Sequence, residues 1–276
     1  MTYAMDLSRR SFLVHASRGT IALAVLSVAG CGPTALSSSG PSASTAGASA
    51  AGGGSSDGSG AAGSAGASGG SAGAPPSSAA GGVTWQRANL GFVSAYVLVR
   101  AGEAVIVDTG VAGSEGAIHQ AITAGGLDWG QVGHVILTHK HADHAGSIGA
   151  VLGAATAATG YAGEADLPNI TSPRPLTSVK DGDMVFGLRI VATPGHTIGH
   201  VAVLDEAGGI LVAGDALRTA SGTLDGSNPS FTEDAAQAKA TVVKLGRLTF
   251  ETLLVGHGEP ILEGASAQVA ALAAGS

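Results

Sequence analysis

Three histidines and an aspartate crowd one short stretch of this sequence, LTHKHADH at residues 137–144. Imidazole nitrogens and carboxylate oxygens are the ligands by which proteins most often bind zinc and similar divalent cations. In an extended backbone His139 and His141 point the same way, because alternate residues share a face. Asp143 and His144 begin a predicted helix and can face a second position, so the stretch predicts ligands for two adjacent cations.

Three further donors lie outside this stretch, each at the end of an apolar run. His196 follows LRIVATPG, Asp215 ends GILVAGD, and His257 lies in TLLVGHG. Loops at the ends of strands are where a rigid scaffold displays binding and catalytic side chains. We therefore expect two more histidines and a bridging acid to complete both sets of ligands, so that residues far apart in the chain meet at one site.

Buried strands must position these donors, and the sequence has seven short runs suited to them. The runs are rich in β-branched residues and bounded by Gly, Asp or Pro; they cover residues 95–100, 104–110, 134–139, 188–195, 200–205, 209–215 and 252–258. Helices are predicted at residues 114–125, 143–153, 232–247 and 262–274. Thr232 supports the third, because Glu233 and Asp234 then occupy its first turn. Alternating strands and helices indicate a layered α/β domain.

Five motifs in this order, VIVDTG, THKHADHAG, TPGHTIGH, AGDAL and VGHGEP, resemble those of the metallo-β-lactamase-fold superfamily. The resemblance covers nearly all of residues 83–276 and implies an αββα sandwich with its metals at the rim formed by strand ends. It also implies a ligand set: one metal on His139, His141 and His196, a second on Asp143, His144 and His257, and Asp215 as the bridge.

The resemblance further suggests that Asp108, in VIVDTG, orients a ligand histidine. This role is physically sensible, because a liganding imidazole usually donates its other N–H to an acceptor; the alternative is an ordinary turn residue. His200 is interpreted as structural or as a neighbour of the ligands. Arg218 could bind a substrate carboxylate or an oxyanion, or lie on the surface. Tyr161, after the predicted motif helix, is a candidate for lining the pocket.

The expected chemistry of such a site is hydrolysis. Two divalent cations lower the pKa of a bridging water toward neutrality, and the hydroxide attacks a carbonyl carbon or a phosphorus. Asp143 would lie beside this water and could handle its proton. We expect a small ester, lactone or thioester as substrate and zinc as the metal, with iron or manganese as alternatives. A formal net charge of −7 and no clustered basic residues argue against nucleic acid as a partner.

The same ligands also serve other reactions in this superfamily. Some β-lactamases use a cysteine as metal ligand where this chain has Asp215. N-acyl homoserine lactonases often have a tyrosine at the position of Arg218, and glyoxalase II shares the HxHxDH ligands. The alternatives are therefore a metal-dependent β-lactamase or phosphodiesterase and, from a different class, an oxidoreductase resembling the mononuclear iron persulfide dioxygenases.

The N-terminal residues predict export. Arg9 and Arg10, in SRRSFL, precede a short apolar run at 21–29, a pattern that resembles the twin-arginine signal. The run is too short to cross a bilayer, which needs about 20 apolar residues. It ends in VAGC, which resembles a lipobox, so residues 1–31 are interpreted as a signal peptide with lipidation at Cys31.

The segment 32–82 is composed almost entirely of Gly, Ala and Ser. Such a composition cannot bury enough apolar surface to offset its conformational entropy, and a disordered tether is expected. The sequence thus predicts a folded domain at 83–276, anchored by lipid at Cys31 to a bacterial cell membrane on its periplasmic or outer-membrane face. Because Cys31 is the single cysteine, disulfides within the chain are excluded.

Overall fold

The computed structural model describes residues 81–275. The predicted signal peptide, the lipidation site at Cys31 and all but the last two residues of the predicted tether lie outside the described residues. No helix within the described part of the chain combines the length and the apolar character needed to cross a membrane.

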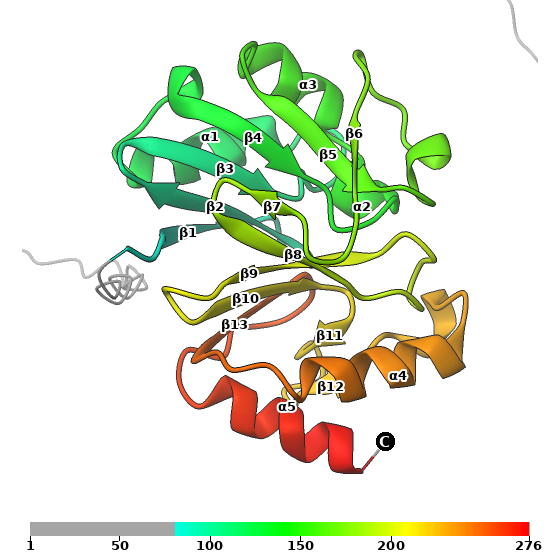
Figure 1. Cartoon of the computed structure of the whole chain (residues 1–276). Helices are drawn as coiled ribbons and strands as arrows, with labels where there is room; N and C mark the ends of the chain where they lie inside the picture. Colours follow the sequence, from blue (N-terminus) through cyan, green and yellow to red (C-terminus); the bar gives the residue numbers. More distant parts are fainter. Residues whose placement is uncertain (1–80, 276) are drawn as a thin grey trace, which may run out of the picture. The chain divides into compact units, whose positions relative to one another are not determined.

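Two β-sheets stack face to face (Figure 1). The first has the order β1-β2-β3-β4-β5-β6, and its strands are β1 Thr84–Asn89, β2 Ser94–Arg100, β3 Glu103–Val107, β4 Val132–Ile136, β5 Thr159–Gly163 and β6 Thr177–Val179. The second has the order β13-β10-β9-β8-β7, and its strands are β7 Met184–Val185, β8 Leu188–Ala192, β9 Val201–Asp205, β10 Ile210–Gly214 and β13 Thr252–Val255. A small ribbon pairs β11 Leu217–Arg218 with β12 Asp225–Gly226.

Helices cover the outer face of each sheet. Helices α1 (Glu115–Ala124) and α3 (Ile148–Ala154) pack on the first sheet, and α4 (Ala235–Leu245) and α5 (Ala265–Ala274) pack on the second (Figure 1). The short helix α2 (Ala142–Ala145) and the 3-10 turns η1 (Trp129–Gln131), η2 (Leu167–Asn169) and η3 (Pro229–Phe231) lie in connections. The predicted αββα sandwich is therefore confirmed.

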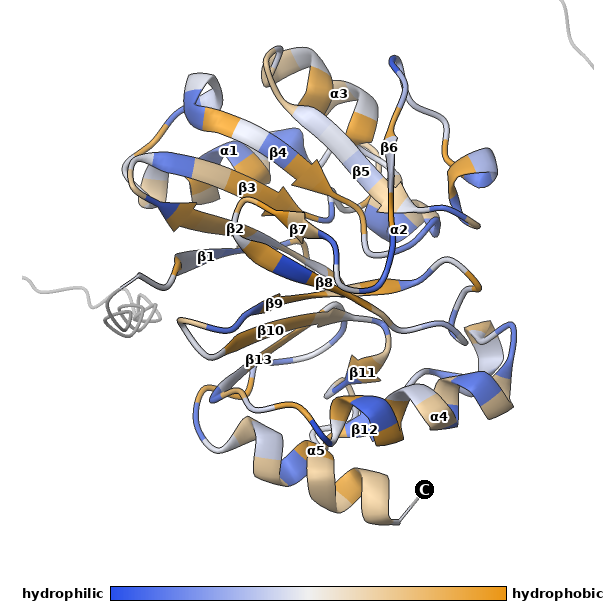
Figure 2. Cartoon of the chain, viewed as in Figure 1, coloured by the Kyte–Doolittle hydropathy of each residue, from blue (hydrophilic) through white to orange (hydrophobic). Residues whose placement is uncertain are grey.

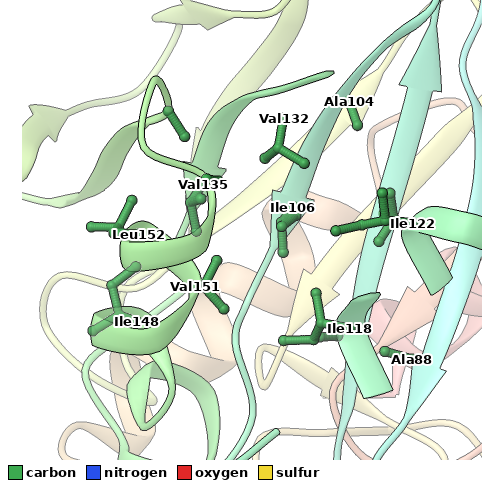
Figure 3. Packing of buried hydrophobic residues seen from close by; sticks show 14 of the residues in the cluster. Ala88, Ala104, Ile106, Ile118, Ile122, Val132, Val135, Ile148, Val151 and Leu152 are labelled. Carbon is green, nitrogen blue, oxygen red and sulfur yellow. The ribbon is translucent and has the colours of Figure 1, made fainter. Parts of the chain in front are cut away.

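Three layers of buried apolar side chains hold the sandwich together. One fills the space between the sheets, one lies beneath α4 and α5, and one lies beneath α1 and α3, where Ile118, Ile122 and Val151 meet the strands (Figure 3). Strands β4, β9 and β10 are accordingly coloured largely hydrophobic in Figure 2, whereas α4 carries hydrophilic residues. Strands β9 and β10 are buried along their whole length, as expected for strands covered on both faces.

The predicted helix at 143–153 is two helices. Helix α2 ends at Ala145 and α3 begins at Ile148, because the backbone between them packs closely on the loop after β3. The Gly146 N–H donates to the Gly110 carbonyl at 2.9 Å, and the Ser147 hydroxyl donates to the Val111 carbonyl at 2.6 Å. A Cβ at Gly146 would collide with the Ala112 N–H, so the close approach requires glycine and interrupts the helix.

The start of the third predicted helix also differs. The prediction placed Glu233 and Asp234 in its first turn, but α4 begins at Ala235 and Asp234 is its N-cap. The Asp234 carboxylate accepts from the Gln237 N–H at 2.9 Å, as a capping aspartate does. The Thr232 hydroxyl instead donates to the Asn228 carbonyl at 2.7 Å, which ties down the loop that leads to the helix.

Tyr96 links the two sheets. Its buried hydroxyl donates to the Val255 carbonyl at 2.8 Å, and burial raises the pKa of its phenol. We expect Tyr96→Phe to lower the free energy of unfolding by about 1–2 kcal/mol, since a buried carbonyl loses its partner. Urea denaturation would measure this change. Tyr161→Phe is the control, because the Tyr161 hydroxyl is only partly buried; an equal loss in both variants would contradict a special role for Tyr96.

Candidate metal centre

The predicted donors lie at one edge of the sandwich, where strands of both sheets end. His139 follows β4 of the first sheet. His196, Asp215 and His257 follow β8, β10 and β13 of the second. His141 precedes α2, which contains the remaining two donors, Asp143 and His144. The topology thus brings together residues that are up to 118 positions apart in the sequence, from 139 to 257.

Three histidines form the first cluster. His139 Nε2 and His196 Nε2 each lie 3.0 Å from His141 Nδ1. His139 and His196 are buried, whereas His141 is partly exposed and lines the cavity above. Three imidazole nitrogens that face one another at this distance are suited to bind one divalent cation.

Asp143, His144 and His257 form the second cluster. His257 Nε2 lies 3.3 Å from Asp143 Oδ2 and 3.5 Å from His144 Nε2. His144 is fully buried, and the other two side chains are about one quarter exposed, at 27% for Asp143 and 22% for His257. Two imidazoles and a carboxylate are a suitable ligand set for a second divalent cation.

Asp215 lies between the clusters. Its Oδ1 is 3.2 Å from His144 Nε2, while its Oδ2 is 3.3 Å from His196 Nε2 and 3.2 Å from His257 Nε2. In the group of His139, His144 and Asp215, the three donor atoms all lie within 4.8 Å of one another. The donor types and their convergence fit a pair of cations that share one carboxylate.

The two histidines of the second cluster and Asp215 shift one another's pKa. Burial would lower the pKa of His144, but the carboxylates of Asp215 and Asp108 hold it well above its ordinary value. Hydrogen bonds to Asp143 and Asp215 raise the pKa of His257 to about 10. Burial would raise the pKa of Asp215, but His144 keeps it well below its usual range. Without cations these histidines therefore bind protons, and a cation must displace them.

In the first cluster, the pKa values of His139 and His196 are lowered rather than raised. Burial, followed by repulsion from the nearby charge of His144, keeps the pKa of His139 well below its ordinary value. Burial also lowers the pKa of His196 to about 4, against the opposing effect of Asp215. Both imidazoles are therefore neutral at physiological pH, the form in which a histidine binds a metal.

Asp108 contacts His144 directly and His139 through Thr138. It directly follows β3 with a positive φ of 65°, a conformation that Asp tolerates better than most residues. Its Oδ2 lies 2.8 Å from His144 Nδ1, the nitrogen that faces away from Asp215. Its Oδ1 accepts from the Thr138 N–H at 2.7 Å, and the Thr138 hydroxyl lies 3.0 Å from His139 Nδ1. Asp108 thus orients His144 of the second cluster, and Thr138 orients His139 of the first.

His200 holds the backbone of Asp215. Its Nε2 accepts from the Asp215 N–H at 3.1 Å, which leaves Nδ1 as the donor to the Thr193 hydroxyl at 2.7 Å. Burial lowers the pKa of His200 to about 3, so the ring stays neutral in this tautomer. Its nitrogens are both engaged, which accounts for its place outside the groups of converging donors.

A cavity of about 560 Å³ opens above the donors. Phe92 and Phe231 flank it and are exposed, at 64% and 66% of their surface. The Phe92 ring stacks on His257, with centroids 6.2 Å apart, and the Phe92 carbonyl accepts from His257 Nδ1 at 2.7 Å. The other lining residues are His141, Ala142, Asp143, His196, Asp215, Arg218, Ala220 and Asn228. The cavity is therefore lined by donor side chains and Arg218 together with the two phenylalanine rings.

Arg218 and Tyr161 occupy different places. Arg218 lines the cavity, where its Nη2 lies 2.7 Å from Asp225 Oδ2 and its Nε donates to the Gly226 carbonyl. Tyr161 does not line this cavity, contrary to the prediction. It lies within β5 rather than in a loop, and its hydroxyl is 3.2 Å from His134 Nδ1.

Some residues of the site were not predicted. Thr138 immediately precedes the HxH pattern and could have been found as a neighbour of the ligands. Phe92 and Phe231 are two of only five phenylalanines in the chain, and both lie in polar or Gly-containing segments rather than in apolar runs. A large aromatic residue outside the periodic segments is the signal that could have identified them.

The family model of the metallo-β-lactamase superfamily matches residues 88–257, and the chain belongs to this superfamily. The protein is accordingly a metal-dependent hydrolase, with His and Asp clusters suited to divalent cations. It is similar to a probable metallo-hydrolase, YflN, of Bacillus subtilis, with 28% identity over 65% of this chain and 84% of that protein.

The chain is also similar to a further enzyme and to two solved structures. A hydroxyacylglutathione hydrolase of Acidiphilium cryptum is 36% identical over 59% of this chain, which spans only 63% of that enzyme's length. A metallo-β-lactamase family protein of Thermus thermophilus has the same fold, with a TM-score of 0.55, 24% identity and coverage of 70% of this chain and 79% of that one. The protein TTHA1623, solved in a di-iron-bound form, gives a TM-score of 0.54 at 24% identity, covering 64% of this chain and 93% of that one.

Proposed function

We propose that this protein hydrolyses a small ester, lactone or thioester with two bound divalent cations, and that zinc is the preferred cation. The observation that supports this most strongly is the position of Asp215, whose carboxylate lies within 3.3 Å of histidines from both clusters. His139, His141 and His196 would hold one cation, and Asp143, His144 and His257 the other. Iron and manganese accept the same donors, and the di-iron form of TTHA1623 favours iron as the next candidate.

The chain's own residues prepare the site for hydrolysis. When bound, a pair of divalent cations makes water a good nucleophile at neutral pH and withdraws electron density from a carbonyl oxygen. Asp143 combines a place on the cavity wall with partial exposure, so it is the acid best placed to accept a proton and pass it to solvent or to the leaving group. Arg218, also on the wall, is placed to neutralise charge on a substrate oxygen.

The cavity supports a small substrate with an apolar side. Its volume of about 560 Å³ lies within the range of small-molecule sites, roughly 300–1,000 Å³. Phe92 and Phe231 contribute exposed apolar rings to its lining, and the Phe92 ring stacks on the donor His257. The hydroxyacylglutathione hydrolase relatives favour a thioester among the candidate substrates.

The test is metal analysis of the purified protein followed by assays on lactones, esters, thioesters, phosphodiesters and a chromogenic β-lactam. We expect two divalent cations per chain and turnover of at least one ester, lactone or thioester that chelation abolishes and zinc restores. A single iron per chain with oxidation of a persulfide would support the oxidoreductase alternative instead. A protein that holds two cations and hydrolyses only β-lactams or phosphodiesters would contradict the proposed substrate class.

We also propose that the chain is exported through its twin-arginine signal and anchored by lipid at Cys31. We expect replacement of Arg9 and Arg10 by Lys to leave the precursor inside the cell, because the signal depends on the arginine pair. Cys31→Ala should leave export intact and release the protein from the membrane fraction. Cell fractionation with a labelled fatty acid measures both effects. Normal export and lipidation of the double Lys variant would contradict the proposal.

A further inference from the structure

A buried carboxylate, that of Asp166, lies between the two loops that carry His139, His141 and His196. Asp166 follows β5 and precedes η2, and its side chain has no exposed surface. Burial of a charge is costly unless hydrogen bonds and an opposite charge compensate it. The groups that compensate Asp166 come from the two loops that position His139, His141 and His196.

Asp166 joins these two loops directly. Its Oδ2 accepts from the Lys140 N–H at 3.0 Å, and Lys140 stands between His139 and His141. The same oxygen accepts from the Thr197 hydroxyl at 2.6 Å, and its Oδ1 accepts from the Gly199 N–H at 3.0 Å. One side chain therefore sets the distance between the loop after β4 and the loop after β8.

Lys140 supplies the opposite charge. Its Nζ lies 3.9 Å from Asp166 Oδ1 and 2.6 Å from Glu233 Oε1. Glu233 in turn accepts from the Ile198 N–H at 3.0 Å, and its own N–H donates to the His196 carbonyl at 3.1 Å. The loop of His196 is thus held from two sides, by Asp166 at Thr197 and Gly199 and by Glu233 at Ile198.

The packing around Asp166 leaves little room for the loops to shift. A Cβ at Gly199 would lie 2.7 Å from the Asp166 carboxyl carbon, closer than van der Waals contact allows. The backbone of this loop therefore lies directly against the carboxylate. A side chain that is held this tightly fixes the Lys140 backbone and the Thr197 side chain, and these two residues directly adjoin the three histidines in the sequence.

We propose that Asp166 is a positioning residue for the three-histidine cluster, and that it acts on one of the two cation sites only. The inference rests on the proposed function, because it concerns the same pair of cations. Among the described hydrogen bonds, none joins Asp166 to Asp143, His144 or His257. His144 is held by Asp108 and His257 by the Phe92 carbonyl instead.

The test compares Asp166→Asn with Asp205→Asn in the full chain, titrated with Co²⁺ and followed by visible absorption. An amide at 166 keeps one acceptor oxygen and turns an NH₂ toward a donor, which loosens both loops. Asp205 is the matched control, because it is a buried aspartate with its own ion pair to Arg100 at 2.9 Å, at the far end of β9. Asp143→Asn serves as the reference that weakens the other site.

We expect two Co²⁺ equivalents in the wild type. In Asp166→Asn one equivalent binds about 10-fold more weakly, the lower end of the range for groups that bond to ligands directly, because Asp166 holds the histidines through their loops. Asp143→Asn identifies the equivalent that binds at the second cluster. We expect this equivalent to keep its affinity in Asp166→Asn. Asp205→Asn should bind both equivalents with wild-type affinity. If Asp166→Asn does not fold, Thr197→Val removes one hydrogen bond to Asp166 and should weaken the same equivalent by a smaller factor.

Two outcomes would overturn the inference. The first is that Asp166→Asn and Thr197→Val bind both equivalents with wild-type affinity. The second is that Asp166→Asn and Asp205→Asn both weaken the two equivalents equally. Either result would show that Asp166 is only a structural residue. In either case the wild type still binds two cations and the proposed function stands. A wild-type protein that takes up no Co²⁺ would overturn the proposed function together with this inference.

Discussion

Asp215→Asn is expected to lower kcat/KM by about 10³-fold or more and to weaken both cation sites. The substitution keeps the shape of the side chain and removes the negative charge that three histidine nitrogens face at 3.2–3.3 Å. Cation catalysis supplies several kcal/mol of transition-state stabilisation, and each 1.36 kcal/mol is tenfold in rate. Steady-state kinetics and metal content of the purified variant measure the two effects.

Asp225→Asn is the control for this experiment. Asp225 pairs with Arg218 beside the cavity but is 51% exposed and faces no donor histidine, so Asp225→Asn should keep the wild-type metal content and lower kcat/KM far less than Asp215→Asn does. An Asp215→Asn protein with wild-type activity would remove the bridging role. An equal loss in Asp225→Asn would assign the effect to charge near the cavity rather than to cation binding.

Asp108→Asn is expected to weaken cation binding by about 10–100-fold. Asp108 receives the Thr138 N–H on one oxygen and faces His144 Nδ1 with the other. An amide NH₂ facing Nδ1 would favour the His144 tautomer that has its proton on Nε2, the nitrogen directed at Asp215. A histidine protonated there cannot bind a cation. Asn also accepts the positive φ of this position, so the backbone should be preserved.

Isothermal titration with Zn²⁺ measures this loss. Thr138→Val is a useful comparison, because it removes the hydroxyl contacts to Asp108 and His139 while keeping the carboxylate that orients His144. We expect a smaller effect in that variant. Unchanged Zn²⁺ affinity in Asp108→Asn would show that the contact with His144 is not needed to set its tautomer.

The donors could be predicted because residue type and position both point to them. His139, His196, Asp215 and His257 each end a strongly apolar run, and such runs form the buried strands of both sheets. The runs themselves indicated a layered α/β domain, and the αββα architecture was implied by the resemblance of the motifs to the metallo-β-lactamase-fold superfamily. Local sequence was sufficient here because a fully buried strand needs an apolar run whatever its neighbours are.

The remaining elements depend on tertiary contacts. Strand β1 is a half-exposed edge strand with the polar sequence TWQRAN, and β5 includes two glycines, so neither has the pattern of a buried strand. The break between α2 and α3 arises from the approach of Gly146 to the loop after β3. The contacts of Asp166 with Lys140 and Thr197 join loops far apart in the sequence, and no local pattern indicates them.

Anomalous X-ray diffraction from crystals of the metal-loaded protein tests the central claim most directly. We expect two peaks about 3.5–4 Å apart. One should contact His139, His141 and His196, the other Asp143, His144 and His257, and both should contact Asp215. A single peak, or peaks that do not share Asp215, would contradict the dinuclear centre on which the proposed hydrolysis depends.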